Sequence, residues 1–378
     1  MTAGLRTPGT PFLALDPARM ERNIARLDAH LAALGVPLRP HFKTAKCLEI
    51  ARRMSGGRIG PATVSTLREA EVLADAGFTD ILYAVGIAPD KLARVAALRA
   101  RGVDLAVILD SREQAEAVGA ASRASGGRIP ALIELDADRH RSGLAPDDPR
   151  LTGLGAAIES GGGELRGVLV HAGESYKCRT ADSRAAAAEA ERAAAVHGAE
   201  RLRGAGLACP VVSVGSTPTA HAARNLEGVT EVRAGVYVFH DLVMAGLGVC
   251  AIDDIAISVV ATVIGHQADK GWIITDAGWM AMSRDRGTAA QELDQGYGLV
   301  ASLEGEVLAD LVVAAASQEH GIMALRPGSP ASLPVLPVGS RVRIFPNHAC
   351  ATAAQFDRYY VLGAGGAIDA EWPRIGGW

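Results

Sequence analysis

The chain has 378 residues, of which 49% are hydrophobic and 21% are charged, as in a folded globular protein with a sizeable core. The formal net charge of −4 does not favour a nucleic-acid partner, which usually recruits a basic face. No apolar stretch is long enough to span a membrane, and residues 1–12 lack the basic and apolar regions of a signal peptide. The five cysteines are widely spaced and do not form a disulfide pattern, so the sequence predicts a cytoplasmic protein.

Short apolar runs and helical stretches alternate from residue 11 to about residue 250. A strand at 11–15 precedes a helix at 17–34, where Leu27, Leu31 and Leu34 have the spacing of one buried helix face. Six further apolar runs are typical of buried parallel strands, at 38–42, 81–85, 105–109, 131–135, 167–170 and 211–214. Helices are expected between them, at 89–101, 111–120 and 181–205. This rhythm predicts a (β/α)8 barrel in residues 1–252, with a doubly wound open sheet as the alternative.

The pattern changes after residue 252 to alternating runs that are typical of strands. These runs lie at 255–264, 272–276, 298–303 and 341–345. Residues 327–337 are rich in Pro and Ser and predict a surface loop. We therefore expect an antiparallel β domain in residues 253–378, joined by the first residues of the chain.

Several polar segments follow predicted barrel strands, where such barrels build their active sites. A desolvated Lys43 would favour Schiff-base chemistry, although surface lysines at a strand end explain Lys43 and Lys46 better when the segment is taken alone. Arg141 could bind an anion or polarise a phenolic oxygen, and a solvated loop is equally plausible. His171 begins a segment that contains Tyr176, but a lone histidine there is more often structural than catalytic.

Small residues follow the predicted strand at 211–214. Gly215, Ser216 and Thr217 would let backbone N–H groups and hydroxyls approach a phosphate, although a tight turn uses the same residues. The segment 233–237 could supply further backbone donors to that phosphate.

His348 and Cys350 form the sharpest local pattern. In an extended segment, residues i and i+2 point to the same face, so both side chains could reach one ion. Imidazole and thiolate suit Zn²⁺ better than Mg²⁺ or Ca²⁺. Two ligands do not fill a tetrahedral shell, so water, substrate or a further side chain would complete it. A buried free cysteine without a metal is the alternative, and from the residues alone it is the better one.

Taken together and in this order, these segments resemble the D-threonine aldolase and D-serine dehydratase family. Its members are fold-type III pyridoxal-phosphate enzymes, related to alanine racemases through the barrel. The resemblance extends from Thr10 to Cys350 and implies that Lys43, in a Pro-His-x-Lys segment, carries the cofactor, and not Lys46. It also implies the following cofactor contacts: Gly215, Ser216 and Thr217 at the phosphate, with backbone help from Gly235 and Val236; His171 facing the ring; Arg141 near the phenolic oxygen; Arg233 beside the ring nitrogen; and Tyr176 in the same pocket.

The family's metal pair maps onto His348 and Cys350. Aldolase-type members often carry His-x-Asp and take Mn²⁺ or Mg²⁺, whereas dehydratase-type members carry His-x-Cys and take Zn²⁺. This chain therefore resembles the dehydratases, and residues 265–283 look closest to the 3-hydroxy-D-aspartate dehydratases. Ala45 departs from the family pattern, because many members have His at that position. Any mechanism that needs this histidine is put in doubt.

The resemblance implies a zinc- and pyridoxal-phosphate-dependent dehydratase acting on a 3-hydroxy D-amino acid. The expected substrate is threo-3-hydroxy-D-aspartate, and the expected products are oxaloacetate and ammonia. Lys43 would take the Cα proton, and zinc would bind the β-hydroxyl. The alternatives are a D-serine dehydratase, retro-aldol cleavage to glycine and an aldehyde, racemisation, and a non-catalytic carrier of the cofactor. A homodimer is expected, because fold-type III relatives build their sites between subunits.

Overall fold

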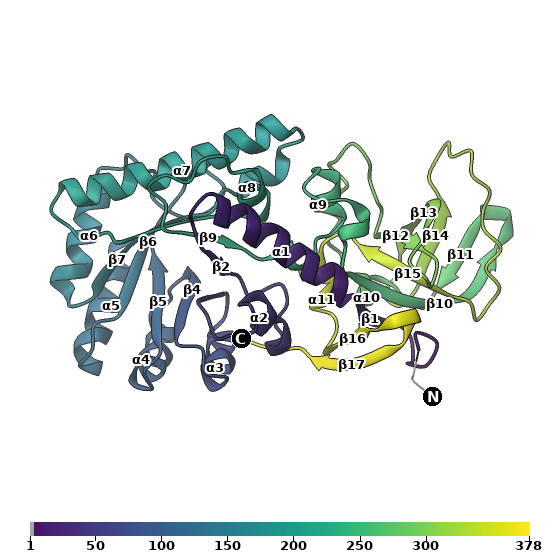
Figure 1. Cartoon of the computed structure of the whole chain (residues 1–378), viewed down its shortest axis with the longest axis horizontal. Coiled ribbons are helices and arrows are strands. Elements are labelled where there is room, and N and C mark those ends of the chain that lie inside the picture. Colours follow the sequence, from purple (N-terminus) through teal and green to yellow (C-terminus); the bar gives the residue numbers. More distant parts are fainter. Residues whose placement is uncertain (1–3) are drawn as a thin grey trace. The chain divides into compact units, whose positions relative to one another are not determined.

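The computed structural model describes residues 4–378, which form two compact units (Figure 1). We call residues 25–235 with 377–378 the barrel unit, and residues 4–24 with 236–376 the β unit. The sequence predicts a division after residue 252, whereas the chain leaves the barrel unit after Gly235. Residues 236–252 belong to the β unit, where Leu242 packs in a buried cluster with Ile255, Leu299 and Phe345. No helix in residues 4–378 combines the length and apolar character that a membrane crossing requires.

Eight parallel strands form the sheet of the barrel unit, in the order β2-β9-β8-β7-β6-β5-β4-β3. A bridge between His41 and Thr63 joins the two end strands, and the Phe42 amide donates to the Thr63 carbonyl at 2.7 Å. The sheet therefore closes, which confirms the predicted barrel and shows that the open-sheet alternative is wrong. The strands are β2 Leu38–Pro40, β3 Ala62–Val64, β4 Asp80–Gly86, β5 Asp104–Leu109, β6 Pro130–Leu135, β7 Glu164–Val170, β8 Val211–Val214 and β9 Glu231–Ala234.

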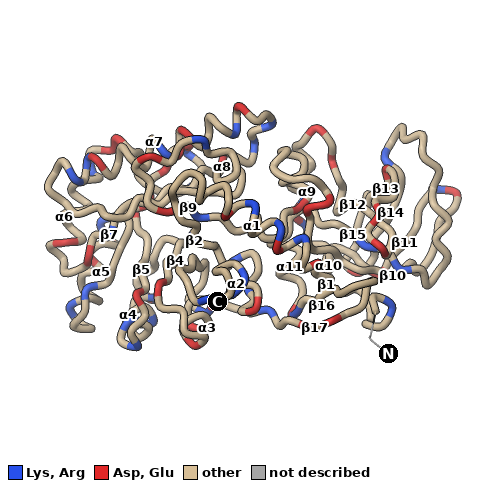
Figure 2. The backbone as a smooth tube through the Cα atoms, in the orientation of Figure 1, with Lys and Arg blue, Asp and Glu red and all other residues tan. Residues whose placement is uncertain are grey.

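Helices alternate with these strands and cover the outer side of the sheet (Figure 1). Acidic and basic residues lie side by side along them (Figure 2), and many form ion pairs such as Arg112 with Glu116. Ser111 and Thr180 are the N-cap residues of α5 and α7, and each forms a capping box that satisfies backbone donors at the start of the helix. The helices are α1 Pro17–Ala33, α2 Leu48–Met54, α3 Leu67–Asp75, α4 Leu92–Ala100, α5 Arg112–Ser125, α6 Arg150–Gly161, α7 Ala181–Gly204 and α8 Thr217–Ala222, with 3-10 turns η1 Pro89–Lys91 and η2 Gly173–Lys177.

The β unit is a nine-stranded sheet in the order β11-β14-β13-β12-β15-β10-β1-β16-β17, and β10 also pairs with β11. Neighbouring strands are antiparallel except β1 and β16, which are parallel. The predicted antiparallel β domain is therefore confirmed, with β1 from the start of the chain inside its sheet. The strands are β1 Phe12–Leu15, β10 Ile257–Gln267, β11 Trp272–Thr275, β12 Gly298–Ala301, β13 Val307–Ala316, β14 Gly321–Leu325, β15 Arg341–Pro346, β16 Arg358–Leu362 and β17 Ile368–Pro373.

Short helical turns connect the strands of the β unit. They are α9 Leu242–Gly246, α10 Trp279–Met282, α11 Ala349–Ala353, η3 Val236–Val238, η4 Ile252–Asp254, η5 Ala268–Lys270 and η6 Ala364–Gly366. Residues 327–337 contain no helix or strand, as expected of the predicted loop.

Two differences from the predicted elements affect the site. The strand predicted at 38–42 ends at Pro40, because residues 42–45 form a turn in which the Lys46 amide donates to the Phe42 carbonyl at 2.8 Å. The prediction that the segment around His348 is extended is wrong. His348 has extended backbone angles but stands at the N-cap of α11, and Cys350 lies inside that helix.

Candidate active site

The predicted cofactor residues lie at the carboxyl ends of barrel strands, where parallel barrels carry their active sites. Five strands contribute: Lys43 follows β2, Arg141 follows β6, His171 and Tyr176 follow β7, Gly215, Ser216 and Thr217 follow β8, and Arg233 and Gly235 are in and just after β9. Val236 is the next residue, in η3 of the β unit.

Lys43 is exposed, as a surface lysine at a strand end would be, and is not desolvated. Its backbone N–H donates to His41 Nδ1 at 3.3 Å, which ties the turn to the residue that closes the barrel. Lys46 differs from Lys43, because its Nζ lies 3.1 Å from the fully buried carboxylate of Glu69. Glu69 thus holds Lys46 in a structural ion pair, while the turn presents Lys43 to the surface.

Two histidines, the buried His41 and the half-buried His171, lie close to Lys43. His171 Nδ1 donates to the Gly215 carbonyl at 3.0 Å, which joins the ends of β7 and β8. Burial lowers the pKa of His171 to about 3, against the Gly215 hydrogen bond and with help from the charges of Lys43, Arg141 and Arg233. Burial, and then the same three cations, also lower the pKa of His41 well below its ordinary value. Lys43, Arg141 and Arg233 therefore form one cationic group around two neutral imidazoles.

Arg233 is buried at the centre of a hydrogen-bond network inside the barrel. It donates from Nη1 to Ser213 Oγ and from Nη2 to the Val170 carbonyl, each at 2.6 Å. Ser213 in turn donates to Glu231 Oε1 at 2.6 Å. Burial lowers the pKa of Arg233 to about 10, so the guanidinium keeps its charge at neutral pH.

Gly215, Ser216 and Thr217 form the turn from β8 into α8. The Gly215 amide donates to Glu191 Oε1 at 3.1 Å, and the Ser216 amide donates to Thr219 Oγ1 at 3.0 Å. Ser216 Oγ lies 2.9 Å from Ser175 Oγ, so hydroxyl groups gather here. A Cβ at position 215 would lie 2.1 Å from the Arg233 carbonyl oxygen, so close packing of the loops explains this glycine without a ligand.

Arg141 and Tyr176 lie on loops beside this cluster. Arg141 Nη2 is 3.6 Å from Glu134 Oε1, and its side chain is 52% exposed, so it can swing toward a ligand. Tyr176 is half-buried in η2. Gly235 follows β9, where a Cβ would approach Thr44 Oγ1 within 2.9 Å.

The chemistry of this group fits pyridoxal phosphate, which carries an anionic phosphate and a phenolic oxygen. Three cationic side chains, the exposed lysine amine among them, and a turn with several hydroxyl groups supply opposite charge, a nucleophile and hydrogen bonds.

The predicted metal pair lies in the β unit. His348 Nδ1 is 2.5 Å from Asp285 Oδ2, and the His348 and Cys350 side chains are hydrogen-bonded to each other. Burial lowers the pKa of His348, but the Cys350 thiolate and Asp285 outweigh burial and raise it to about 11. Buried Asp241 adds negative charge and accepts a hydrogen bond from the Ala349 amide at 2.9 Å.

The negative charges around His348 that keep it protonated also favour a divalent cation, which would displace that proton when it binds. The thiolate, imidazole and carboxylate donors fit a transition-metal ion. Within residues 4–378, however, no group of three or more His, Cys, Asp and Glu side chains has the arrangement of a metal site. The residues present therefore fit a metal with an incomplete protein shell.

Sequence reasoning missed four residues of these two groups: His41, Glu191, Asp241 and Asp285. His41 belongs to the Pro-His-x-Lys segment and could have been found there. Glu191 is 2% exposed, but it lies in an Ala-rich helix, where an acidic residue in the sequence suggests a solvent-exposed helix face. Asp241 and Asp285 are far from His348 in sequence, and no local pattern links them to it.

Comparisons with known proteins cover the whole chain. The family model "Alanine racemase, N-terminal domain" matches residues 15–242, and the model "Putative serine dehydratase domain" matches residues 256–362. D-threo-3-hydroxyaspartate dehydratase of Delftia sp. (strain HT23) is 54% identical over 377 residues, which cover 99% of both chains. D-serine dehydratase of Dictyostelium discoideum is 31% identical over 374 residues, which cover 93% of both chains.

Solved structures agree with these matches. The structure of D-threo-3-hydroxyaspartate dehydratase from Delftia sp. HT23 has a TM-score of 0.96 at 53% identity and covers 100% of both chains. A Cys-to-Ala mutant of D-threo-3-hydroxyaspartate dehydratase in the metal-free form also has a TM-score of 0.96 at 53% identity, and covers 99% of this chain and 100% of that one. The chain therefore belongs to the D-threonine aldolase and D-serine dehydratase family, in which an alanine racemase N-terminal domain precedes a serine dehydratase domain.

Proposed function

We propose that this protein is a pyridoxal-phosphate-dependent lyase that converts threo-3-hydroxy-D-aspartate to oxaloacetate and ammonia. The observation that carries the proposal is the 54% identity, over 99% of both chains, to D-threo-3-hydroxyaspartate dehydratase. The exposed amine of Lys43 among cationic groups supports it, because such a site suits an anionic cofactor and a dicarboxylic substrate.

Lys43 is proposed to hold the cofactor through its amine and, once released, to take the proton from the substrate Cα. Pyridoxal phosphate, when bound, supplies an electron sink for negative charge at Cα. The remaining contacts are proposed by family likeness: Gly215, Ser216, Thr217, Gly235 and Val236 for the phosphate, His171 and Tyr176 for the ring, Arg141 for the phenolic oxygen and Arg233 near the ring nitrogen.

His348 and Cys350 are proposed to hold a divalent metal, and a relative's metal-free Cys-to-Ala variant supports a metal in this family. Thiolate softness favours Zn²⁺ over Mn²⁺ or Mg²⁺. Zinc, when bound, supplies the Lewis acidity that makes a hydroxyl a better leaving group. Asp285 would orient His348 through its 2.5 Å contact with Nδ1.

The overall reaction balances without an oxidant or a reductant. The substrate loses its Cα proton and its β-hydroxyl as water, and the resulting enamine takes up water and releases ammonia. Water lost in the first stage equals water used in the second, so oxaloacetate and ammonia form in equal amounts.

The test is a product assay on purified protein supplied with pyridoxal phosphate and Zn²⁺. threo-3-Hydroxy-D-aspartate, D-serine and D-threonine are offered separately, and ammonia, 2-oxo acid and glycine are measured. The proposal expects equal ammonia and 2-oxo acid, fastest with threo-3-hydroxy-D-aspartate. A faster reaction with D-serine would favour a D-serine dehydratase, the activity of the 31%-identical relative. Glycine with an aldehyde would mean retro-aldol cleavage, inverted configuration would mean a racemase, and no product from any substrate would favour a cofactor carrier.

Two further properties are part of the proposal. The protein is proposed to act in the cytoplasm, which the wide spacing and odd number of its five cysteines support, because they do not form the pattern of a disulfide framework. It is also proposed to form a homodimer, by likeness to fold-type III enzymes. Light scattering after gel filtration would measure the mass, and a monomer would contradict the dimer.

A further inference from the structure

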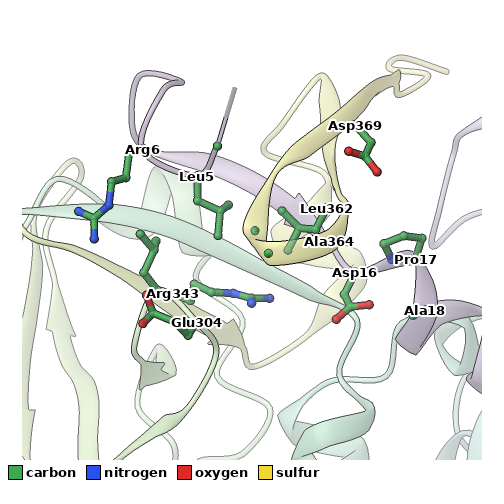
Figure 3. A pocket seen from close by; sticks show the side chains of 15 residues that line it. Leu5, Arg6, Asp16, Pro17, Ala18, Glu304, Arg343, Leu362, Ala364 and Asp369 are labelled. Carbon is green, nitrogen blue, oxygen red and sulfur yellow. The ribbon is translucent and has the colours of Figure 1, made fainter. Parts of the chain in front are cut away.

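A pocket of about 1050 Å³ lies wholly inside the β unit (Figure 3). Its wall is built from the N-terminal segment, the start of α1, the turn between β12 and β13, strand β15 and the loop that contains η6. None of the proposed cofactor or metal residues lines it. The volume is just above the range of about 300–1,000 Å³ for pockets that hold small organic molecules.

Arg343, on β15, lines this pocket, and most of its N–H groups donate to no described residue. Its side chain is 4% exposed and donates one hydrogen bond to the described residues 4–378, from Nε to Ser258 Oγ at 2.9 Å. Its Nη2 is buried and has no hydrogen-bond partner there. A guanidinium has five N–H donors; four of them donate to none of these residues, and the two on Nη2 are also shielded from water.

The charge of Arg343 also lacks a partner. Asp16 is the acidic residue whose charge acts on Arg343, but Asp16 Oδ2 is 3.3 Å from Arg19 Nε and is paired with that arginine. Arg343 itself forms no ion pair with the residues that the structure describes. Burial, and then the nearby Arg19 charge, lower the pKa of Arg343 to about 10, with Asp16 opposing them. Asp16 thus acts on two arginines beside the pocket but forms an ion pair with Arg19 and not with Arg343.

An unpaired buried cation is costly, because it has lost its hydration and gained no opposite charge. Phe345 offers a weak compensation, since its ring centroid is 5.8 Å from the guanidinium carbon of Arg343 and of Arg19. Figure 3 shows the Arg343 guanidinium extending toward Asp16 along the pocket. An anionic group in the pocket would supply the missing charge and accept the unused N–H groups.

We propose that this pocket binds a small organic molecule through a carboxylate or phosphate group, with Arg343 as the main contact. The exposed carboxylates of Glu304 and Asp369 also line the pocket. They oppose ligands with several negative charges, so the ligand carries a single oxyanion group or a compensating positive charge. The proposal concerns binding and does not depend on the reaction that the protein catalyses.

Binding is tested on the purified holoenzyme at constant ionic strength in sodium chloride. Acetate and methyl phosphate are the probes for the carboxylate and phosphate alternatives, and calorimetry measures their affinities. We expect saturable binding of at least one probe. Arg343→Met should weaken that binding by at least about tenfold, because it removes a charge-assisted contact. Arg358→Gln, a surface arginine on β16 paired with Asp357 and Glu371, is the matched control and should bind the probe like the natural chain.

Thermal unfolding without a probe separates a binding role from a structural one. Removing an unpaired buried charge should leave the melting temperature of Arg343→Met equal to or above that of the natural chain. The probe should raise the melting temperature of the natural chain but not of the variant. If Arg343→Met does not fold, Arg343→Lys keeps the charge, and loss of most of the probe's affinity in that variant supports the proposal.

The identity of the probe that binds assigns the ligand: acetate alone means a carboxylate, and methyl phosphate alone means a phosphate. The proposal is overturned if neither probe binds the natural chain, or if Arg343→Met or Arg343→Lys binds the probe as tightly as the natural chain. Turnover on the preferred substrate should stay unchanged in Arg343→Met, which distinguishes this pocket from anion binding at the catalytic residues.

Discussion

Burial controls the charge of the two histidines beside Lys43. The pKa of His171 falls to about 3 and that of His41 falls well below its ordinary value, in both cases chiefly through burial. Both imidazoles are therefore neutral at neutral pH, and the positive charge around them belongs to Lys43, Arg141 and Arg233. The neutral His171 donates from Nδ1 to the Gly215 carbonyl, which leaves its Nε2 as an acceptor for a ligand.

This neutrality makes stability depend on pH. The folded chain leaves His171 unprotonated until the pH approaches about 3, whereas the unfolded chain protonates it below its ordinary pKa of 6.5. The unfolded state thus binds more protons between these values, and stability falls as the pH falls through this window, by at most about 1.4 kcal/mol per pH unit for one histidine. Urea unfolding of the cofactor-free protein between pH 7 and 4 should show a shallower slope in His171→Gln. Exposed His320→Gln should keep the natural slope, and equal slopes in all three proteins would contradict the argument.

Lys43 should be required both for attachment of the cofactor and for removal of the substrate proton. Lys43→Ala should lose the visible absorbance of the bound cofactor, because no amine remains to attach it. Turnover should fall by at least about a thousandfold, because the same amine serves as the base. Lys270→Ala, a lysine in η5 near Trp272, should keep both properties. Full activity of Lys43→Ala would refute the assignment.

Cys350 should be required for metal binding. Cys350→Ala removes the softest donor near His348, so zinc affinity should fall by about 10- to 100-fold or more, and activity should fall with zinc content. Metal analysis after dialysis, together with activity after chelation and zinc return, measures both. The half-buried Cys178 offers the control, because Cys178→Ala should retain zinc. Activity that survives both Cys350→Ala and thorough chelation would rule out the metal.

At the scale of elements, the spacing of β7 and β8 depends on the absence of a side chain at Gly167. A Cβ there would lie 1.9 Å from the Val211 carbonyl oxygen on the paired strand. Gly167→Ala should therefore separate the two strands and destabilise the protein by about 2–3 kcal/mol. Gly153→Ala in α6 is the contrasting change, because a Cβ at position 153 meets nothing within 4 Å. This substitution should stabilise the protein by about 0.5–1 kcal/mol. Denaturant unfolding compares both, and an unchanged Gly167→Ala midpoint would show that the strands adjust.

The separation of these strands matters for the site as well as for stability. His171 directly follows β7 and Gly215 directly follows β8, and their hydrogen bond joins the two strand ends. Glu191, from α7, accepts hydrogen bonds from the backbone amides of Ala172 and Gly215 and so joins the two loops. The positions of the predicted ring and phosphate contacts are therefore set by the pairing of neighbouring strands.

At the scale of the whole molecule, the start of the chain completes the β unit. Strand β1 is fully buried between β10 and β16, whose residues follow it by more than two hundred positions. A chain that begins at Ala25 lacks this strand. Its β unit should lose more than about 5 kcal/mol, the size of a whole domain's stability. Circular dichroism during heating should show no cooperative transition for the β unit, whereas a chain that begins at Thr10 should keep it. Equal melting of both chains would show that β1 is dispensable.

The lengths of the segments decide which elements could be predicted. The runs that form β5, β6 and β8 are mostly apolar, with one polar residue each, so burial on both faces is visible in the sequence. β9 has four residues like β8, but two of them, Glu231 and Arg233, are charged, so no apolar run marks it, and β3 has only three residues, too few for a period to emerge. The pair His348 and Cys350 was predicted as extended, yet the helix α11 begins between them. Their side chains still meet, because His348 stands at the N-cap with extended backbone angles.

Periodicity in the sequence by itself determined the barrel class, and the resemblance of its short motifs to a known family singled out Lys43, His171, Arg233, His348 and Cys350 as candidates, because periodicity and motifs are local properties. Tertiary structure alone decided which distant groups meet them. Closure of β2 against β3 positions the Lys43 turn, burial neutralises His171, and Asp285 and Asp241 approach His348 from other segments. It also left Arg343 buried without an ion pair to any described residue. Burial and charge balance are sums over neighbours far apart in the chain, so no local pattern can contain them.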